Sequence, residues 1–249
     1  MSSEQGRAVI TVEQARALVR GELGTQMAKF PARFCKPAYF GAPPARDRPA
    51  AINNGTATLL DFRGMLLAIT CHHVIEGYRR KLADDPDCFF AIADSHFDPL
   101  PQIISEDNAT DIAVIQVTAE QAAVITRNNN GIGEAFYSLN VWQPEPVEVG
   151  DFVTYAGFPG DLREHLSFDG ISFGSYSSGA CRVTDQHADY LTCEFEREYW
   201  IENFVEREPE SLGGLSGGPA FLIRHSAAGI VSYEFAGLIY RMHESTESL

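Results

Sequence analysis

The residues best suited to chemistry in this chain are a serine surrounded by glycines, two adjacent histidines and an aspartate. Ser216 lies in residues 213–219, GGLSGGP, and an apolar run follows at residues 220–223. Glycines allow positive φ angles and close backbone approach, so neighbouring N–H groups can converge on one point. An acyl-transfer nucleophile needs that arrangement, with backbone donors about 3 Å from the developing oxyanion. The segment is a candidate nucleophile loop, although a glycine-rich turn can also be merely flexible.

A nucleophilic serine needs a base and a group that orients the base. Residues 66–75, LLAITCHHVI, place His72 and His73 at the end of an apolar strand, and Asp111 opens another apolar run. Taken singly, these are a strand end and a turn residue, but the order His, Asp, Ser predicts a catalytic triad. Cys71 with the two histidines could also belong to a metal site, although no distant pair of ligands with metal-site spacing accompanies them.

These segments resemble motifs of the trypsin/chymotrypsin-like serine peptidases, especially their bacterial intracellular members. Residues 70–74, TCHHV, resemble the family's TAAHV motif and select His73, the residue before valine, as the base. Residues 111–114 match its DIAV motif, and residues 214–219 match its GxSGGP motif. Two further segments look like family segments: GTAT at 55–58 and VGD…GFPG at 149–160.

The resemblance covers about residues 51–243 and implies an all-β fold of two packed six-stranded antiparallel β-barrels. His73 and Asp111 would lie on the first barrel and Ser216 on the second. The resemblance implies that Ser216 attacks the peptide carbonyl while His73 takes its proton and later returns it. Asp111 would orient the imidazole, and the N–H groups of Gly214 and Ser216 would form the oxyanion hole. No metal or organic cofactor is implied.

Short β-type runs separated by turns begin near residue 51, a texture typical of all-β proteins. A connector at residues 142–146, WQPEP, divides these runs into two parts of similar length. The predicted domains are an N-terminal helix and proline-rich extension over 1–50, a first β-barrel over 51–146 and a second over 147–249.

The N-terminal extension has a helical part and a proline-rich part. A helix is predicted over residues 11–23, because apolar residues recur at helical spacing and Thr11 with Gln14 resembles a capping box. Five prolines between positions 31 and 49 argue against long helices and central strands, so a loop is predicted there.

The resemblance also offers a specificity pocket. Counting back from the nucleophile, Glu210 falls where trypsin has the aspartate at its pocket base, and Ser211 matches the serine beside it. A buried carboxylate there would favour substrates with Arg or Lys; the same residues could instead form a solvated acidic loop. On the opposite wall Tyr240, Arg241 and Met242 replace small residues of the family, so Met242 could block the pocket or Arg241 could reverse its charge.

Composition limits the partners. Lys and Arg total 19 against 34 Asp and Glu, a formal net charge of −15. That charge argues against general binding to nucleic acid or to anionic lipid, and no apolar run of about 18 residues could span a membrane. The expected partners are a protein or peptide substrate and a regulatory protein or a second copy of the chain that restrains the peptidase.

Cysteine usage and the first residues indicate a compartment. Five scattered cysteines without a CxxC pair predict reduced thiols, with Cys181 and Cys193 the one pair that could bond. The first residues do not read as a secretory signal, so a cytoplasmic location is expected. Leu215 stands where secreted family members carry an aspartate that receives a new amino terminus, so that activation route is excluded.

The function expected from the sequence is a trypsin-like serine endopeptidase acting through an acyl-enzyme. One alternative is a catalytically silent peptidase fold that binds proteins. A second is an α/β-hydrolase-type esterase, in which Glu234 and His243 would have to complete the triad after Ser216. No alternation of strands and helices precedes the serine, which disfavours the esterase.

Overall fold

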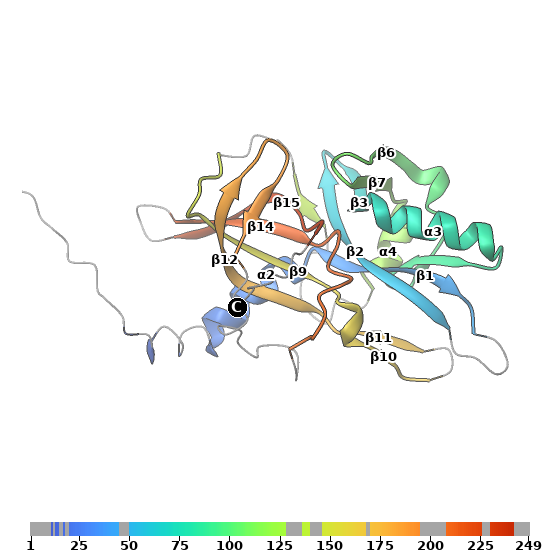
Figure 1. Cartoon of the computed structure of the whole chain (residues 1–249), viewed down its shortest axis with the longest axis horizontal. Coiled ribbons are helices and arrows are strands. Elements are labelled where there is room, and N and C mark those ends of the chain that lie inside the picture. Colours follow the sequence, from blue (N-terminus) through green and yellow to red (C-terminus); the bar gives the residue numbers. More distant parts are fainter. Residues whose placement is uncertain are drawn as a thin grey trace, which may run out of the picture.

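Two sheets, antiparallel in their main pairings, form the framework of the computed structural model (Figure 1). The structure describes residues 11, 13–14, 17, 20–44, 50–127, 136–139, 146–167, 170–194, 208–225 and 230–241. The helices whose bounds lie in this part of the chain are α2 (Glu22–Ala32), α3 (His72–Asp84) and α4 (Ala119–Ile125). None of the described helices has both the length and the apolar character that crossing a membrane requires.

The first sheet has the strand order β5-β4-β1-β2-β3-β7-β6, with the short β8 parallel to β2. Its strands are β1 (Cys35–Ala42), β2 (Ala51–Phe62), β3 (Met65–Cys71), β4 (Phe89–Ile92), β5 (Ser95–His96), β6 (Ile103–Asp107), β7 (Ile112–Gln116) and β8 (Tyr137–Ser138). A short 3₁₀ helix, η1 (Leu100–Gln102), precedes β6. The core of this half is formed by buried apolar residues of these strands and of α3 and α4.

The second sheet has the order β13-β12-β9-β14-β15, and a separate hairpin pairs β10 with β11. These strands are β9 (Phe152–Gly157), β10 (Arg163–His165), β11 (Ile171–Phe173), β12 (Tyr176–Gln186), β13 (Leu191–Cys193), β14 (Pro219–His225) and β15 (Val231–Leu238), with a 3₁₀ helix, η2 (Gly160–Leu162), before β10. The mostly-β prediction is therefore confirmed. Closed six-stranded barrels are not detected, because the strand pairings of the described residues leave both sheets open.

The N-terminal capping box is present. The Thr11 N–H donates to Gln14 Oε1 at 2.9 Å, and the Gln14 N–H donates to Thr11 Oγ1 at 3.2 Å. The described residues between 13 and 20 are helical, and a bend at Gly21 separates them from α2. The predicted helix over 11–23 therefore agrees with the structure at the described residues from 13 to 20, but the bend at Gly21 ends it before residue 23.

The loop predicted from the five prolines is wrong for residues 31–42. Pro31 lies in the last turn of α2, and Pro37 lies in β1, a central strand of the first sheet. Pro37 faces Thr56 of β2, whose N–H donates elsewhere, so this pair exchanges no hydrogen bond that a proline would break. On its other side the ladder with β4 starts one residue later, and the Pro37 carbonyl accepts the N–H of Ala93. Proline is tolerated because its missing donor is not needed at this position.

An aromatic cluster joins the two sheets. Its centre is Phe221 of β14, which is fully buried and lies with its ring centroid 5.1 Å from that of Phe30 in α2 and 5.0 Å from that of Tyr137 in β8. Leu60 and Leu67 of the first sheet belong to the same buried cluster. Further aromatic members are Phe34, Phe62, Tyr233 and Phe235. The N-terminal segment thus covers the junction, since α2 also contacts β9 and β12 of the second sheet.

Replacing the centre of this cluster tests its importance. Phe221→Ala is expected to lower the free energy of unfolding by about 3–5 kcal/mol, because it removes a fully buried ring and leaves a cavity. The matched control is Phe152→Ala in β9, whose side chain is 47% exposed and should contribute less than about 1 kcal/mol. Urea denaturation of both variants measures the difference, and equal losses would contradict the role given to the cluster.

All five cysteines are free in the structure. Cys181 and Cys193 lie on the neighbouring strands β12 and β13, as the sequence suggested, yet they are not bonded to each other. Burial raises the pKa of Cys35 to about 12 and the pKa of Cys193 to about 11. A raised thiol pKa keeps the sulfur protonated at neutral pH, so these thiols should react slowly.

We therefore expect little labelling of the native protein by iodoacetamide near pH 7.5 and labelling of all five thiols after unfolding. A reducing agent should leave the melting temperature unchanged. Intact-mass spectrometry of unreduced protein checks both statements. A stoichiometric loss of two hydrogens in the unreduced protein would reveal a disulfide and contradict the reduced state.

Candidate functional site

The pairing of β3 with β7 brings His73 and Asp111 together. Cys71, the last residue of β3, lies opposite Ile112, the first residue of β7. The residue after the first strand and the residue before the second therefore meet, and the N–H of His72 donates to the Asp111 carbonyl at 3.0 Å. Asp111 itself has a φ of 56°, a left-handed conformation that aspartate tolerates better than most residues.

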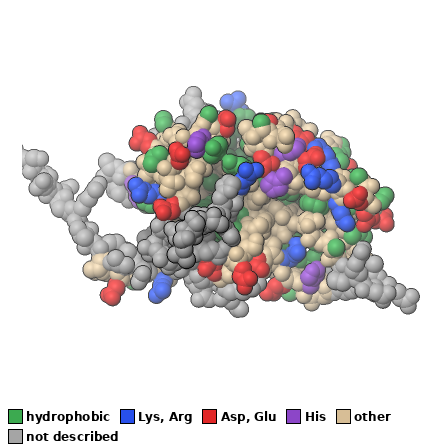
Figure 2. Space-filling model, in the orientation of Figure 1, with side chains coloured by type: hydrophobic (Ala, Val, Ile, Leu, Met, Phe, Trp, Pro, Cys, Tyr) green, Lys and Arg blue, Asp and Glu red, His purple; other side chains and the backbone are tan. Residues whose placement is uncertain are grey.

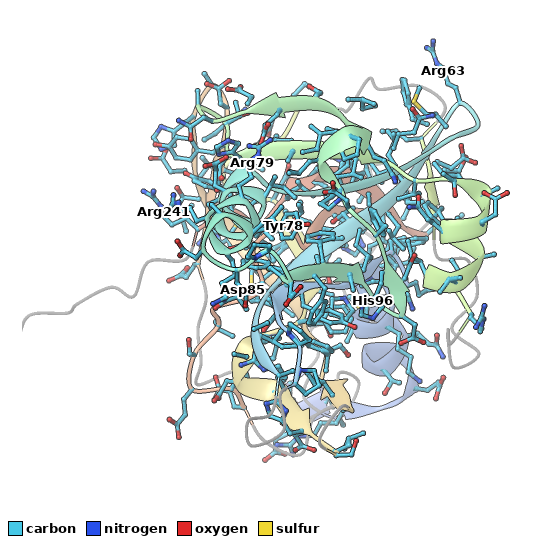
Figure 3. The ribbon with its side chains drawn as sticks, turned by 90° about the vertical axis from the view of Figure 1, so that its right-hand side faces the viewer. Arg63, Tyr78, Arg79, Asp85, His96 and Arg241 are labelled. Carbon is cyan, nitrogen blue, oxygen red and sulfur yellow. The ribbon has the colours of Figure 1, made fainter. Side chains whose placement is uncertain are left out.

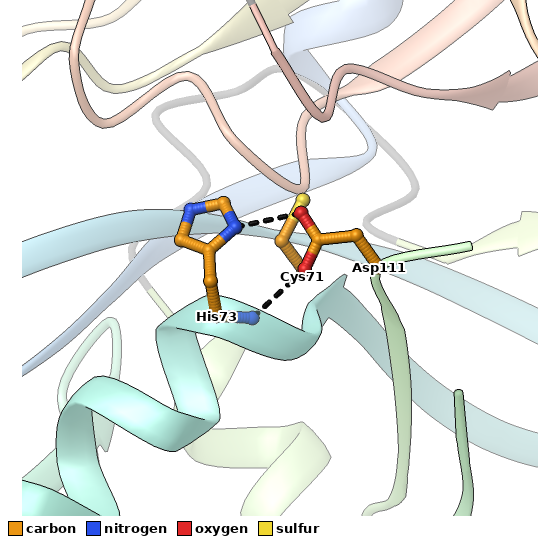
Figure 4. Close-up of side chains that lie close together, drawn as sticks. All are labelled: Cys71, His73 and Asp111. Atoms are coloured by element: carbon orange, nitrogen blue, oxygen red, sulfur yellow. Dashed lines mark hydrogen bonds and ion pairs between the residues drawn. The ribbon is translucent and has the colours of Figure 1, made fainter. Parts of the chain in front are cut away.

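The Asp111 carboxylate holds His73 twice (Figure 4). His73 Nδ1 lies 2.7 Å from Asp111 Oδ2, and the backbone N–H of His73 donates to Asp111 Oδ1 at 2.9 Å. His73 belongs to the first turn of α3, so the carboxylate also lies at the positive end of the helix dipole. The side chain of His73 is 53% exposed and that of Asp111 is 21% exposed. Because Nδ1 contacts the carboxylate, Nε2 is the ring nitrogen that is available to another group.

His72, the neighbouring histidine, has a different partner. Its Nε2 lies 3.3 Å from Glu106 Oε1, and its side chain is only 15% exposed. Arg79 of α3 donates two hydrogen bonds of 2.8 Å to the same Glu106 carboxylate. His72 therefore belongs to an ion-pair network that fastens α3 to β6, and His73 is the one of the two that bonds the Asp111 carboxylate.

Two fully buried threonines of the first sheet donate hydrogen bonds to the loop that contains Ser216, and a third bonds one of them. The Thr56 N–H donates to the Ser216 carbonyl at 2.8 Å, and Thr56 Oγ1 donates to the Gly214 carbonyl at 2.7 Å. Thr58 Oγ1 donates to the Gly217 carbonyl at 2.7 Å, because alternate residues of a strand share one face. Thr70 Oγ1 in turn donates to the Thr56 carbonyl. Sequence motifs did not reveal the role of these threonines, although the GTAT segment contains two of them at the spacing of one strand face.

The glycines of the loop are required by close backbone contacts. A Cβ on Gly217, whose φ is +90°, would lie 2.1 Å from the Thr56 carbonyl oxygen. A Cβ on Gly214, whose φ is +104°, would lie 2.6 Å from the Phe158 carbonyl oxygen. The loop is thus wedged between the two sheets and is not a freely flexible turn.

Two N–H groups of the loop have no hydrogen-bond acceptor among the described residues. The N–H groups of Leu215, Gly217 and Gly218 all donate to carbonyls of the protein. Within the described residues, the N–H groups of Gly214 and Ser216 donate to no protein acceptor. These are the two donors that the sequence assigned to an oxyanion hole, and an oxyanion would satisfy both.

The main chain of Ser216 lies close to the start of α3. A Cβ on Gly55 would lie 3.3 Å from the Ser216 carbonyl oxygen and 2.7 Å from Cγ2 of Val74, the residue after His73. No hydrogen bond between Ser216 Oγ and His73 Nε2 is present among the described residues.

Comparison with known proteins bears on this arrangement. A model of the trypsin-like peptidase domain matches residues 55–230. The chain belongs to the trypsin-like peptidase family. Among solved structures, the active form of the Rv3671c protease from M. tuberculosis is similar at 14% sequence identity and a TM-score of 0.38, over 88% of this chain and 82% of that one. The comparison with curated proteins returned no relative.

Two of the residues assigned to the specificity pocket of this peptidase-family chain are exposed. Glu210 presents its N–H to the Asp161 carboxylate at 2.8 Å, and Ser211 Oγ accepts the N–H of Gly213 at 3.2 Å. A selective pocket for Arg or Lys was predicted from a buried carboxylate, and exposed Glu210 does not supply one. The exposure of Glu210 agrees with the alternative, a solvated acidic loop.

Tyr240 and Arg241 are the described residues that the sequence assigned to the opposite wall of a specificity pocket. Tyr240 packs against the core of the first sheet and lies 6.1 Å from Tyr190, measured between ring centroids. The Arg241 guanidinium lies 6.0 Å from the centroid of the Tyr240 ring and at the edge of the molecule (Figure 3). Met242 lies outside the described residues. On the face seen in Figure 2, basic side chains are interspersed with acidic ones and form no single basic patch.

Cys71 completes the surroundings of the Asp111 carboxylate. Its Sγ donates to the Ile239 carbonyl at 3.4 Å, and the same carbonyl accepts the N–H of Gly217. Burial and the nearby negative charge of Asp111 raise the pKa of the Cys71 thiol far above its ordinary value. The thiol is therefore protonated at neutral pH and packs beneath the carboxylate.

The threonine contacts give a stability prediction. Thr56→Val removes the hydroxyl that serves the Gly214 carbonyl and the Phe158 N–H, so two buried polar groups lose their partner. We expect the free energy of unfolding to fall by about 1–3 kcal/mol or more. Thr56→Ser keeps the hydroxyl and should retain most of that stability. Equal losses in urea denaturation would show that the hydroxyl is not what holds the loop.

Proposed function

We propose that this chain is a serine endopeptidase that hydrolyses peptide bonds of protein substrates through an acyl-enzyme. The observation that carries the proposal is the 2.7 Å contact between His73 Nδ1 and Asp111. It commits one ring nitrogen to the carboxylate and leaves Nε2 for the hydroxyl of Ser216. Membership of the trypsin-like peptidase family supports the same assignment.

In the proposed mechanism, Ser216 Oγ attacks the carbonyl carbon of the scissile peptide while His73 Nε2 takes the hydroxyl proton. The carbonyl oxygen becomes an oxyanion, which accepts hydrogen bonds from the N–H groups of Gly214 and Ser216. Collapse of this intermediate breaks the C–N bond, and the leaving amine takes the proton from His73. A water molecule then attacks the acyl-enzyme by the same route and restores Ser216.

Asp111 contributes by fixing the histidine. With its carboxylate on Nδ1, the neutral imidazole carries its proton there and presents a basic Nε2. The negative charge then stabilises the imidazolium that forms in each step. The second hydrogen bond, from the His73 N–H, prevents the carboxylate from rotating away.

The silent binding module remains the second candidate, because the described residues contain no hydrogen bond from Ser216 Oγ to His73. A fluorophosphonate probe separates the two candidates, since it labels only an activated serine. The α/β-hydrolase is not a candidate, because that fold needs a largely parallel sheet and both main sheets here are antiparallel in their main pairings.

We also propose that the protein works in a reducing compartment such as the cytoplasm, under the control of a partner or effector. Five scattered cysteines, all free, support the first part. Leu215, fully buried in the core of the second sheet, supports the second part, since no carboxylate is present there for activation by a new amino terminus.

Substitutions of the triad test the proposed activity. Ser216→Ala or His73→Ala should lower kcat for peptide hydrolysis by about 10⁶, and Asp111→Asn by about 10⁴ through the wrong imidazole tautomer. His72→Ala is the matched control and should change kcat only slightly, because His72 bonds Glu106. A fluorogenic peptide library measures these rates, with fluorophosphonate labelling of Ser216 as an independent readout.

Two results would contradict the assignment. Loss of activity in His72→Ala with normal cleavage by His73→Ala would show that the base is the wrong histidine. A folded wild-type protein that neither cleaves peptides nor takes the fluorophosphonate label would favour the silent binding module.

A further inference from the structure

Asp111 and His73, two members of the proposed triad, also form a set of potential metal ligands together with Cys71. Cys71 Sγ, a ring nitrogen of His73 and a carboxylate oxygen of Asp111 all lie within 4.8 Å of one another (Figure 4). Thiolate, imidazole and carboxylate are the three ligand types that proteins use for Zn²⁺. In a tetrahedral zinc site such ligand atoms lie about 3.3–3.6 Å apart, given ordinary Zn–N and Zn–S bond lengths. Small shifts of side chains would bring the present atoms to that spacing.

We propose that Zn²⁺ binds Cys71, His73 and Asp111 and reversibly switches the peptidase off. The regulatory half of this inference rests on the proposed function. Binding displaces the thiol proton to solvent and gives the metal a thiolate, an imidazole nitrogen and a carboxylate oxygen. Three protein ligands leave the fourth position for water.

Metal binding and catalysis compete for the same atoms. His73 Nδ1 now bonds Asp111 at 2.7 Å, and a nitrogen that coordinates Zn²⁺ cannot also donate to the carboxylate. The imidazole would lose the orientation that presents Nε2 to Ser216. The metal would also neutralise the charge with which Asp111 stabilises the imidazolium. Occupied and active states therefore exclude each other.

Charge distinguishes this set from a second one close by. His72, Glu76 and Glu106 also bring their ligand atoms within 4.8 Å of one another. Arg79 donates hydrogen bonds to both of those carboxylates, so a cationic group already occupies that place. Among the described residues, no Lys or Arg forms an ion pair with Asp111, whose charged partner is His73. The set around Asp111 is the one that can accept a metal without displacing an arginine.

Cobalt provides a readout that does not depend on activity. Co²⁺ replaces Zn²⁺ in such sites and gives a thiolate-to-metal charge-transfer band in the near ultraviolet when a cysteine is a ligand. Full-length protein carrying Ser216→Ala should show this band on titration with Co²⁺, and Zn²⁺ should abolish it. Adding Cys71→Ser should remove the band, whereas the matched control His72→Ala should keep it.

Because Cys71 is buried, Cys71→Ser could prevent folding, and a second variant tests the metal site independently. His73→Ala changes a half-exposed side chain and should weaken Co²⁺ binding at least about tenfold while the melting temperature stays close to that of the wild type. In the active wild type, micromolar Zn²⁺ should lower turnover, and a chelator should restore it.

The outcomes separate the two hypotheses. Absence of a charge-transfer band, or a band that survives Cys71→Ser, would overturn the metal site whatever the activity. A Cys71-dependent band without inhibition by Zn²⁺ would overturn the regulatory role. A protein inactive in the absence of metal would refute the proposed function, while the cobalt titration would still decide whether the site binds metal.

Discussion

Contact between β2 and the loop around Ser216 is the constraint on which the rest of the structure depends. The loop is covalently part of the second sheet, yet its carbonyls are bound by Thr56 and Thr58 of the first. Because these threonines are fully buried, every hydrogen bond they fail to make would leave an uncompensated polar group. These hydrogen bonds therefore favour the observed packing of the two sheets, which brings the main chain of Ser216 close to the start of α3.

Asp111, the acid of the proposed triad, also serves several contacts at once. Asp111 bonds the imidazole of His73, caps an N–H of the first turn of α3, and accepts the N–H of His72 at its own carbonyl. The orientation of His73 and the start of α3 thus depend on one residue in an uncommon backbone conformation. A substitution of Asp111 would perturb the helix that carries His73 as well as the imidazole itself.

Sequence patterns singled out His73, Asp111 and the glycine loop because each is a local motif, and the structure places the first two in hydrogen-bond contact. They failed for Pro37. A proline disrupts a strand only where the partner strand needs its missing N–H, and the partner strand is distant in the sequence. The role of the buried threonines could not be predicted for a similar reason. Their hydroxyls find their acceptors only on the loop of the second sheet, which is distant in the sequence. Glu210 is exposed, and its exposure could not be predicted because a motif alignment gives a residue's place along the chain but not its burial.

The position of α2 has a consequence for the order in which the molecule is assembled. Phe30 stacks on Tyr233 with ring centroids 4.1 Å apart, so an early segment of the chain must wait for one of the last strands. During synthesis, α2 emerges well before β14 and β15 and stays without these partners until they have been made. Contacts so distant in sequence slow folding. Until those strands emerge, a ribosome-bound chain of this protein would expose the part of Phe30 that later packs on Phe221 and Tyr233 and offer a binding site to chaperones.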